Sequence, residues 1–162
     1  MSNIDCITIT GQIKTIPSEQ LIFRPAAYAL LITGREILLL RMKATGKYHP
    51  PGGGIEIGER MADTLRREVL EETGLQIRVG HLVNVEELFF YYDPSGRAYH
   101  GLHFYYRCDP LSGSLLPDDR VLDGSTEQPR WVPFDNLTAE DFQHGGEQVL
   151  SFCRAQSEAH AA

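Results

Sequence analysis

The sequence lacks the features that mark membrane proteins and proteins that coat nucleic acids. No apolar run approaches the ~20 residues that a membrane-spanning helix requires, and the polar N-terminus does not resemble a signal peptide. Lysine and arginine number 15 against 22 aspartates and glutamates, so the net charge is −7, and the basic residues form no block. We therefore expect neither a membrane partner nor a nucleic-acid partner.

Cysteine is also scarce. The three cysteines, Cys6, Cys108 and Cys153, are odd in number and widely spaced, and no two of them form a CxxC pair. This pattern excludes a disulfide framework and is typical of a protein in a reducing compartment. We expect a cytoplasmic protein in which each cysteine is a small buried or incidental side chain.

The length and composition predict one domain with one core. The chain has 162 residues, of which 42% are hydrophobic and 23% charged. We expect the domain over residues 24–158, an N-terminal extension over residues 1–23 and a disordered tail over residues 159–162. The extension holds an alternating, strand-like segment at residues 6–10. This segment could serve as an edge strand or as a contact in a homodimer, and the sequence leaves both open.

Apolar runs predict the strands of the domain. Residues 26–33 and 36–42 form two such runs, joined at Gly34-Arg35 by a hairpin-type connection. The segment Ile37-Leu38-Leu39-Leu40 is apolar on both faces of a strand, so it belongs in the centre of a sheet. Further elements are expected as strands at residues 77–92 (one strand or two), 98–108 and 130–134, a loop at 111–128, and a C-terminal helix at 146–156. Strands that flank one helix, with another helix at the end, indicate an α/β layered domain.

The most informative segment is residues 53–75, where a cluster of acids follows a glycine-rich turn. If residues 60–73 are helical, Glu68 and Glu72 lie one turn apart on one face, and Glu71 lies beside them. Like charges at this spacing destabilise a helix, so a cation is expected among them. A hard divalent metal ion that faces a phosphate-bearing substrate is the simplest candidate, and a solvated acidic helix face is the alternative.

These residues fill every fixed position of the Nudix box, and on that ground the chain resembles a Nudix hydrolase. The matching residues are Gly53, Glu59, Arg67, Glu68, Val69, Glu71, Glu72, Gly74 and Leu75. The resemblance implies an α/β/α sandwich with a mixed central sheet. It also implies a hydrolase that depends on Mg²⁺, with Mn²⁺ as a substitute, and cleaves the phosphoanhydride bond of a nucleoside diphosphate linked to another group. The implied substrates are nucleoside triphosphates, dinucleoside polyphosphates or nucleotide sugars.

The same resemblance implies roles for single residues. Four groups would bind the metal ion: the carboxylates of Glu68, Glu71 and Glu72 and the backbone carbonyl of Gly52. Glycine lets the chain approach an ion closely. Arg67 would hold a glutamate carboxylate, for which Glu59 is the candidate, through its planar fork and would not touch phosphate. An ordinary surface ion pair is the alternative role for Arg67.

The general base that activates water stays open, because members of the family differ on this point. Glu71 and Glu68, together with Arg67, are the catalytic candidates within the box. Glu127 lies where a downstream loop carboxylate is expected to serve instead. Two acids at the end of an expected strand are further alternatives, Glu86 and Glu87.

Substrate contacts outside the box are predicted from single residues. Tyr91 and Tyr92 lie near the position of a tyrosine that marks dinucleoside-polyphosphate hydrolases in this family, although aromatic strands equally suit core packing. His49, just before the glycine turn, and Lys43 are candidate phosphate contacts. A structural role is the alternative for each of them.

Two histidines, His100 and His103, are three residues apart on an expected strand. Side chains alternate along a strand, so these two point to opposite faces. They are therefore unsuited to binding one metal ion together.

Two other functions compete with the hydrolase. A non-catalytic Nudix-like module that senses a nucleotide would be expected to lose one or more box glutamates, and all are present here. An isomerase of prenyl diphosphates would need a cysteine and an acid beside a deep apolar pocket, and none of the three cysteines has such a context. The hydrolase is favoured, with the sensing module as the alternative.

Overall fold

The computed structural model describes residues 2–121 and 124–161 of the chain. Its strands are β1 (Asn3–Thr8), β2 (Ile13–Pro17), β3 (Leu21–Thr33), β4 (Glu36–Met42), β5 (Tyr48–His49), β6 (Gly52–Gly54), β7 (Leu75–Tyr92), β8 (Arg97–Gly113) and β9 (Thr126–Pro133). The α-helices of the described residues are α1 (Met61–Thr73) and α2 (Gly146–Ala161). Neither of these helices is long and apolar enough to cross a membrane.

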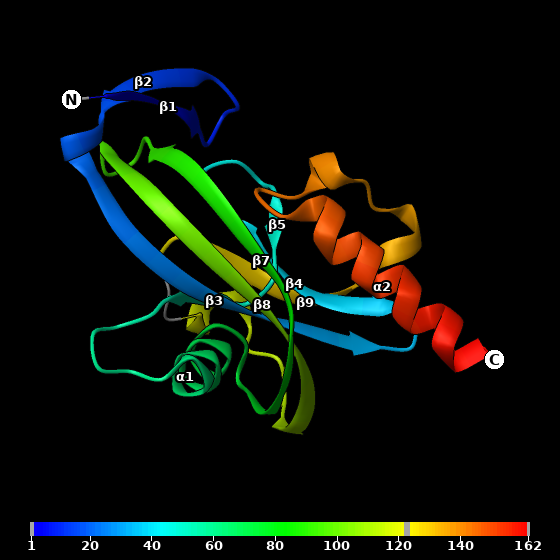
Figure 1. Cartoon of the computed structure of the whole chain (residues 1–162). Coiled ribbons are helices and arrows are strands. Elements are labelled where there is room, and N and C mark those ends of the chain that lie inside the picture. The colour runs from blue at the N-terminus through cyan, green and yellow to red at the C-terminus, as the bar shows by residue number, and fades with distance from the viewer. Residues whose placement is uncertain (1, 122–123, 162) are drawn as a thin grey trace.

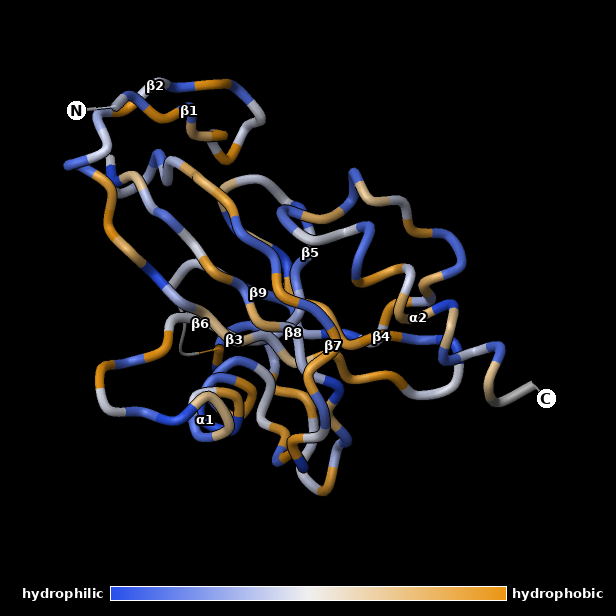
Figure 2. The backbone as a smooth tube through the Cα atoms, viewed as in Figure 1, coloured by the Kyte–Doolittle hydropathy of each residue, from blue (hydrophilic) through white to orange (hydrophobic). Residues whose placement is uncertain are grey.

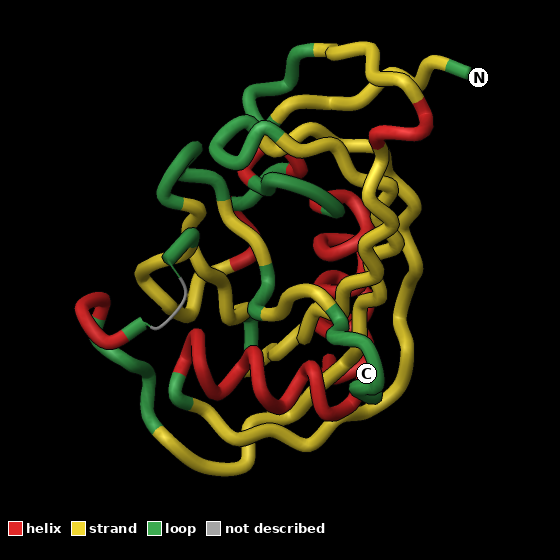
Figure 3. Tube along the Cα trace, turned by 90° about the vertical axis from the view of Figure 1, so that its left-hand side faces the viewer, coloured by secondary structure: helices red, strands yellow, loops and turns green. Residues whose placement is uncertain are grey.

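The strands form one mixed sheet with a helix on each side. Their order is β2-β1-β7-β8-β3-β4-β5, with β6 added to β3 and β9 added to β4. β1 runs parallel to β7 and β3 runs parallel to β8, whereas the other pairs are antiparallel. Figure 1 shows α1 and α2 on opposite sides of the sheet, and Figure 3 shows that the strands curl and do not lie flat. This arrangement confirms the α/β sandwich with a mixed central sheet.

The sheet buries apolar side chains on both faces. On β3, Leu30 belongs to the core beneath α2, whereas Ala29 and Leu31 belong to the core beneath α1, because side chains alternate along a strand. Hydrophobic and hydrophilic residues also alternate along the longer strands β7 and β8 (Figure 2). Residues 37–40 of β4 are completely buried, which confirms the central position expected from their continuous apolar pattern.

The N-terminal extension is a hairpin of β1 and β2, with β2 at the edge of the sheet, because Gly11 (φ 87°) allows a turn between them. Two other segments differ from the expectation. β9 begins at Thr126, where it pairs with β4 beyond a bulge. The loop expected at residues 111–128 is therefore shorter than predicted. Residues 122–123 of this loop lie outside the described residues. α2 continues to Ala161, because neither glycine nor proline interrupts residues 147–161. Residues 159–161 are therefore helical and not a disordered tail, and residue 162 lies outside the described residues.

The three cysteines are free and buried, as expected from their spacing. Burial raises the pKa of the Cys108 thiol to about 11 and that of the Cys153 thiol to about 12. Both thiols therefore stay protonated at neutral pH, and they behave as small apolar side chains.

The turn that precedes the acid cluster depends on Gly52. This residue has a φ of 149°, a conformation that residues with a side chain rarely adopt. A Cβ atom on Gly52 would lie 2.1 Å from the carbonyl oxygen of Ala27. β6 can therefore pair with β3 in this way only when residue 52 is glycine.

We expect Gly52→Ala to lower the free energy of unfolding by about 2–4 kcal/mol, because it combines overpacking with backbone strain. For a chain of this size each kcal/mol lowers Tm by roughly 2–4 °C, which thermal denaturation measures. Gly124→Ala is the matched control, since a Cβ atom at Gly124 would meet nothing within 4 Å. An equal loss of stability in the two variants would contradict this account of Gly52.

Candidate functional site

β6 and α1 bring the backbone of the glycine turn against two acids. The Gly52 N–H donates a hydrogen bond of 2.8 Å to Oε2 of Glu72. A Cβ atom on Gly53 would lie 2.7 Å from Oε1 of Glu68. The Glu68 carboxylate thus occupies space that any larger residue at position 53 would fill.

The backbone carbonyl of Gly52 points out of the sheet ladder. Between β3 and β6, the Ala29 N–H donates to the Pro51 carbonyl at 2.8 Å and the Ile55 N–H donates to the Pro25 carbonyl at 3.0 Å. Bonded and non-bonded positions alternate along an antiparallel pair, so Gly52 lies at a non-bonded position. Its N–H and its carbonyl therefore both face away from β3, toward the edge where Glu72 lies.

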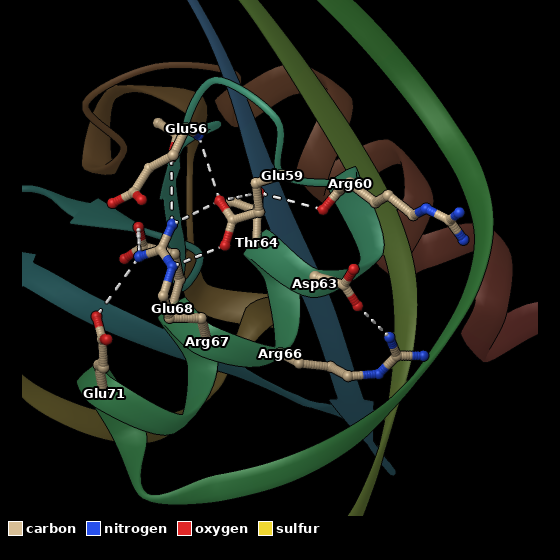
Figure 4. A network of polar contacts seen from close by, with 10 residues as sticks. Glu56, Glu59, Arg60, Asp63, Thr64, Arg66, Arg67, Glu68 and Glu71 are labelled. Carbon is tan, nitrogen blue, oxygen red and sulfur yellow. Dashed lines mark hydrogen bonds and ion pairs between the residues drawn. The ribbon is translucent and has the colours of Figure 1, made fainter.

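Arg67 lies at the centre of the acid cluster (Figure 4). Its Nε and Nη2 atoms each donate to one oxygen of Glu59 at 2.9 Å, so the two side chains form a bidentate pair. Its Nη1 atom donates to Oε1 of Glu68 at 2.7 Å and lies 3.6 Å from Oε2 of Glu71. The Thr64 hydroxyl donates to Oε2 of Glu59 at 2.6 Å. The expected ion pair of Arg67 with Glu59 is present, and one guanidinium contacts three carboxylates.

The pair of Arg67 and Glu59 stays charged over the whole physiological pH range. Hydrogen bonds from the Arg67 guanidinium and then from the Thr64 hydroxyl lower the pKa of the Glu59 carboxyl to about 2. Hydrogen bonding to Glu59 likewise raises the pKa of the Arg67 guanidinium above its ordinary value. The pair is a fixed support against which Glu68 and Glu71 are held.

The three box glutamates differ in exposure. Glu72 is 1% exposed, whereas the side chains of Glu68 and Glu71 are 16% and 44% exposed. The hydroxyl of Thr126, a buried residue of β9, lies 3.5 Å from Oε1 of Glu72. The acids thus form a series from the interior of the protein to its surface, with Glu71 the most open to water.

The acid cluster borders a cavity of about 450 Å³. Gly52, Gly53, Gly54, Glu68 and Glu71 form one part of its wall. Six residues from β3, β7, β8 and the segment before α2 form much of the rest: Arg24, Tyr28, Phe90, Tyr99, His103 and His144. The volume falls in the range of roughly 300–1,000 Å³ that small-molecule sites have.

The structure separates the two tyrosines at the end of β7. Tyr92 lines the cavity, as does His49. Tyr91 is absent from the described residues that line the cavity, because neighbours on a strand point to opposite faces. The amine of Lys14 lies 3.6 Å from the centre of the Tyr91 ring, and the ring packs against the N-terminal hairpin. Of the two, only Tyr92 is placed to touch a ligand in this cavity.

Two other expected site residues, Glu127 and Lys43, are also absent from the described residues that line the cavity. Thr126 is buried and lines it, so strand alternation turns the neighbouring Glu127 to the other side of β9. The backbone N–H of Lys43 donates to the carbonyl of Ser125. The arrangement favours a box glutamate over Glu127 as the general base.

The fold adds to the site two residues, Arg24 and His103, that were not expected there from the sequence. The Arg24 Nη2 atom lies 3.2 Å from where a Cβ atom on Gly54 would be, so this cation borders the glycine turn. His103 is 2% exposed, whereas His100 faces outward and contacts Glu87 at 2.8 Å. The expectation that the two histidines point to opposite faces is confirmed. Arg24 and His103 line the same cavity because β3 and β8 pair in parallel, and no local pattern reveals that pairing.

The donor set at the cluster suits a hard divalent cation. Carboxylate and carbonyl oxygens are the ligands that Mg²⁺ and Ca²⁺ prefer, and carboxylates outnumber the single guanidinium here. Within residues 2–121 and 124–161, no three His, Cys, Asp or Glu side chains already converge closely enough to hold an ion. Arg67 holds the carboxylates of Glu68 and Glu71 at the cavity wall, where they would serve as oxygen ligands.

Replacing Arg67 with methionine is expected to destabilise the fold in a way that depends on pH. The pKa of Glu59 is about 2 in the fold against an ordinary value of 4.5, so the pair stabilises fully above pH 4.5 and loses its effect as the pH falls toward 2. The difference in unfolding free energy between wild type and Arg67→Met should therefore be largest near pH 7 and shrink below pH 4.5. Urea unfolding at several pH values measures this difference.

Arg66→Met is the control, because the ion pair of Arg66 with Asp63 is exposed. A difference in unfolding free energy for Arg67→Met that does not change with pH would contradict the stabilising role of the pair of Arg67 with Glu59.

Comparison with known proteins places the chain in one family. The model of the NUDIX domain matches residues 22–152. The 8-oxo-dGDP phosphatase NUDT18 of Homo sapiens is 30% identical over 105 residues, which cover 63% of this chain and 29% of that protein. The NAD-capped RNA hydrolase NudC of Chromobacterium violaceum is 30% identical over 115 residues, which cover 70% of this chain and 39% of that protein. The chain thus matches less than two fifths of the length of either relative.

Solved structures share the fold. The MutT NUDIX hydrolase from Burkholderia pseudomallei has a TM-score of 0.65 at 23% identity, over 80% of this chain and 97% of that chain. An ADP-ribose pyrophosphatase from Streptococcus suis has a TM-score of 0.62 at 20% identity, over 83% of this chain and 91% of that chain. Identities this low establish the fold alone. The family model, which spans most of the chain and includes the whole acid cluster, shows that this protein belongs to the NUDIX domain family.

Proposed function

We propose that this protein uses Mg²⁺ to hydrolyse a phosphoanhydride bond in a nucleoside diphosphate linked to another group. The observation that carries the proposal is the single guanidinium of Arg67, which holds Glu59, Glu68 and Glu71 at the wall of a ligand-sized cavity. Carboxylates in such a place would repel a phosphate unless a cation lay between them. The arrangement therefore suits chemistry in which an ion joins the acids to a phosphate chain.

The names of the curated relatives support a nucleotide substrate. One is a phosphatase of 8-oxo-dGDP and another is a hydrolase of NAD-capped RNA. We infer that the substrate of this chain is a nucleoside triphosphate, a dinucleoside polyphosphate or a nucleotide sugar. Arg24 lines the cavity beside Gly54, where its guanidinium is placed to donate charge-assisted hydrogen bonds to a phosphate oxygen.

The chain's own residues divide the work of hydrolysis. When bound, the metal ion would be held by Glu68, Glu71, Glu72 and the Gly52 carbonyl and would stabilise negative charge on the phosphate oxygens. Arg67 fixes carboxylates before a substrate enters, so little reorganisation is needed during the reaction. Glu71, the most exposed box glutamate, accepts a proton from the attacking water. The water oxygen bonds to phosphorus, the bridging P–O bond breaks, and the bridging oxygen leaves with the other fragment.

Glu72→Gln should lower magnesium-dependent turnover by about 100-fold or more, because it removes a charge that helps to stabilise the transition state. The variant keeps the size of the side chain and an acceptor for the Gly52 N–H. A phosphate-release screen over nucleoside triphosphates, dinucleoside polyphosphates and nucleotide sugars measures the effect. Glu56→Gln, an exposed change in the same segment, is the control and should turn over at the wild-type rate. Full turnover by Glu72→Gln would exclude the box as the site, and nucleotide binding without hydrolysis by the wild type would favour a sensing module.

Mg²⁺ should also raise the Tm of the wild type but not that of Glu72→Gln. An ion at 100 times its Kd stabilises the folded state by about 2.7 kcal/mol, which corresponds to a rise of roughly 5–10 °C for a chain of this size. A chelator should reverse the rise, and NaCl at equal ionic strength is the control. An unchanged Tm with Mg²⁺ and with Mn²⁺, both alone and beside a nucleotide, would mean that no such ion site exists.

A further inference from the structure

Aromatic and imidazole side chains form part of the cavity wall. Tyr28 of β3, Phe90 of β7, Tyr99 and His103 of β8, and His144 before α2 all line it. The centroid of the His103 ring lies 5.0 Å from that of Tyr28, 6.1 Å from that of Phe90 and 5.8 Å from that of His144. Phe90 and Tyr99 stack at 5.0 Å. We call these five residues the ring compartment.

His103 is buried in this compartment without a hydrogen-bond partner. The residue is 2% exposed, and neither ring nitrogen has a partner among the described residues. A neutral imidazole carries one donor and one acceptor, and burying both unpaired lowers the stability of the fold. A phenylalanine would pack among these rings without that penalty. Packing alone therefore does not account for a histidine, and the missing partners point to a ligand.

The surroundings keep the two imidazoles of the compartment, His103 and His144, uncharged. Burial lowers the pKa of His103 to about 3, and repulsion from His144, Arg24 and His49 adds to the effect. Burial also lowers the pKa of His144 to about 4. At neutral pH both imidazoles are neutral, so they offer hydrogen bonds and add no positive charge to that of Arg24, whose guanidinium carbon lies 5.9 Å from the centre of the Tyr99 ring.

The N-terminal hairpin supplies a further wall. Ile9, just after β1, lines the cavity. Its carbonyl accepts a hydrogen bond of 3.0 Å from the Gln143 side chain, and its N–H donates one of 3.3 Å to the Asp93 carboxylate. The first bond ties the hairpin to the segment before α2, and the second ties it to the turn between β7 and β8. An aliphatic side chain opposite neutral rings suits a planar, uncharged ligand group.

We propose that the ring compartment binds the nucleobase of the substrate and that His103 hydrogen-bonds to the edge of that base. The inference rests on the proposed function, which places the phosphates at the glycine turn. A base has flat faces that stack on aromatic side chains and an edge that carries donors and acceptors. Rotation of the imidazole about its Cβ–Cγ bond turns a ring nitrogen toward the cavity without a change in the backbone.

Uncharged nucleosides test this proposal, because they carry a base without phosphate and require no metal ion. Adenosine, guanosine, cytidine and uridine are titrated into the wild type, His103→Phe and His100→Phe, and the histidine ¹⁵N resonances are followed by NMR. His103→Phe keeps a ring of similar size but removes both nitrogens. His100→Phe is the matched control, because the His100 ring faces outward from the same strand. We expect at least one nucleoside to bind the wild type and the control alike, with the largest shift at His103, and to bind His103→Phe at least tenfold more weakly.

Two further measurements separate recognition from folding. The Tm of His103→Phe should equal or exceed that of the wild type, because two unpaired buried polar atoms are removed. His103→Gln restores a donor and an acceptor and should recover part of the affinity. Equal nucleoside affinity in the wild type and His103→Phe would overturn the proposal. So would a wild type that hydrolyses a nucleoside diphosphate derivative but binds no nucleoside. Nucleoside binding that depends on His103, in a protein that hydrolyses no phosphoanhydride, would support the ring compartment and overturn the hydrolase proposal alone.

Discussion

The guanidinium of Arg67 is the constraint on which the acid cluster depends. Two of its nitrogens are committed to Glu59, and the third reaches Glu68 and Glu71. The directions of the Glu68 and Glu71 carboxylates therefore depend on the position of the Glu59 carboxylate. The Thr64 hydroxyl holds that carboxylate in place through a hydrogen bond. A lysine would neutralise the same charge but could not impose these directions, because it lacks the planar fork.

The glycine turn connects the acid cluster to the ring compartment. β6 lies against the middle of β3, with Gly52 opposite Tyr28 and Gly53 opposite Ala27. The same pairing leaves the carbonyl of Gly52 outside the ladder and leaves room above Gly53 for Glu68. The two proposals share this geometry, because a phosphate chain at the turn would have acids on one side and rings on the other.

Residue patterns predicted the parts of the site that are local in the chain. The acid helix and the central position of residues 37–40 follow from spacing within one segment, whereas the pairing of Arg67 with Glu59 was implied by the resemblance to the Nudix box. Arg24 and His103 enter the site through the pairing of distant strands, for which the sequence carries no short-range signal. The position of Tyr91 could not be predicted for the same reason. Its aromatic character was evident, but only the register of β7 decides that its ring faces the N-terminal hairpin and not the cavity.

The parallel pairing of β3 with β8 has a consequence for the order in which the protein is assembled. It joins residues 21–31 to residues 98–108, and such distant pairings form late because a long loop must first be closed. The acid helix lies between these strands in the chain, so a ribosome completes it well before the second strand emerges. A nascent chain would thus carry the acid cluster before the ring compartment exists. Only molecules in which β8 has paired with β3 would then recognise a nucleobase.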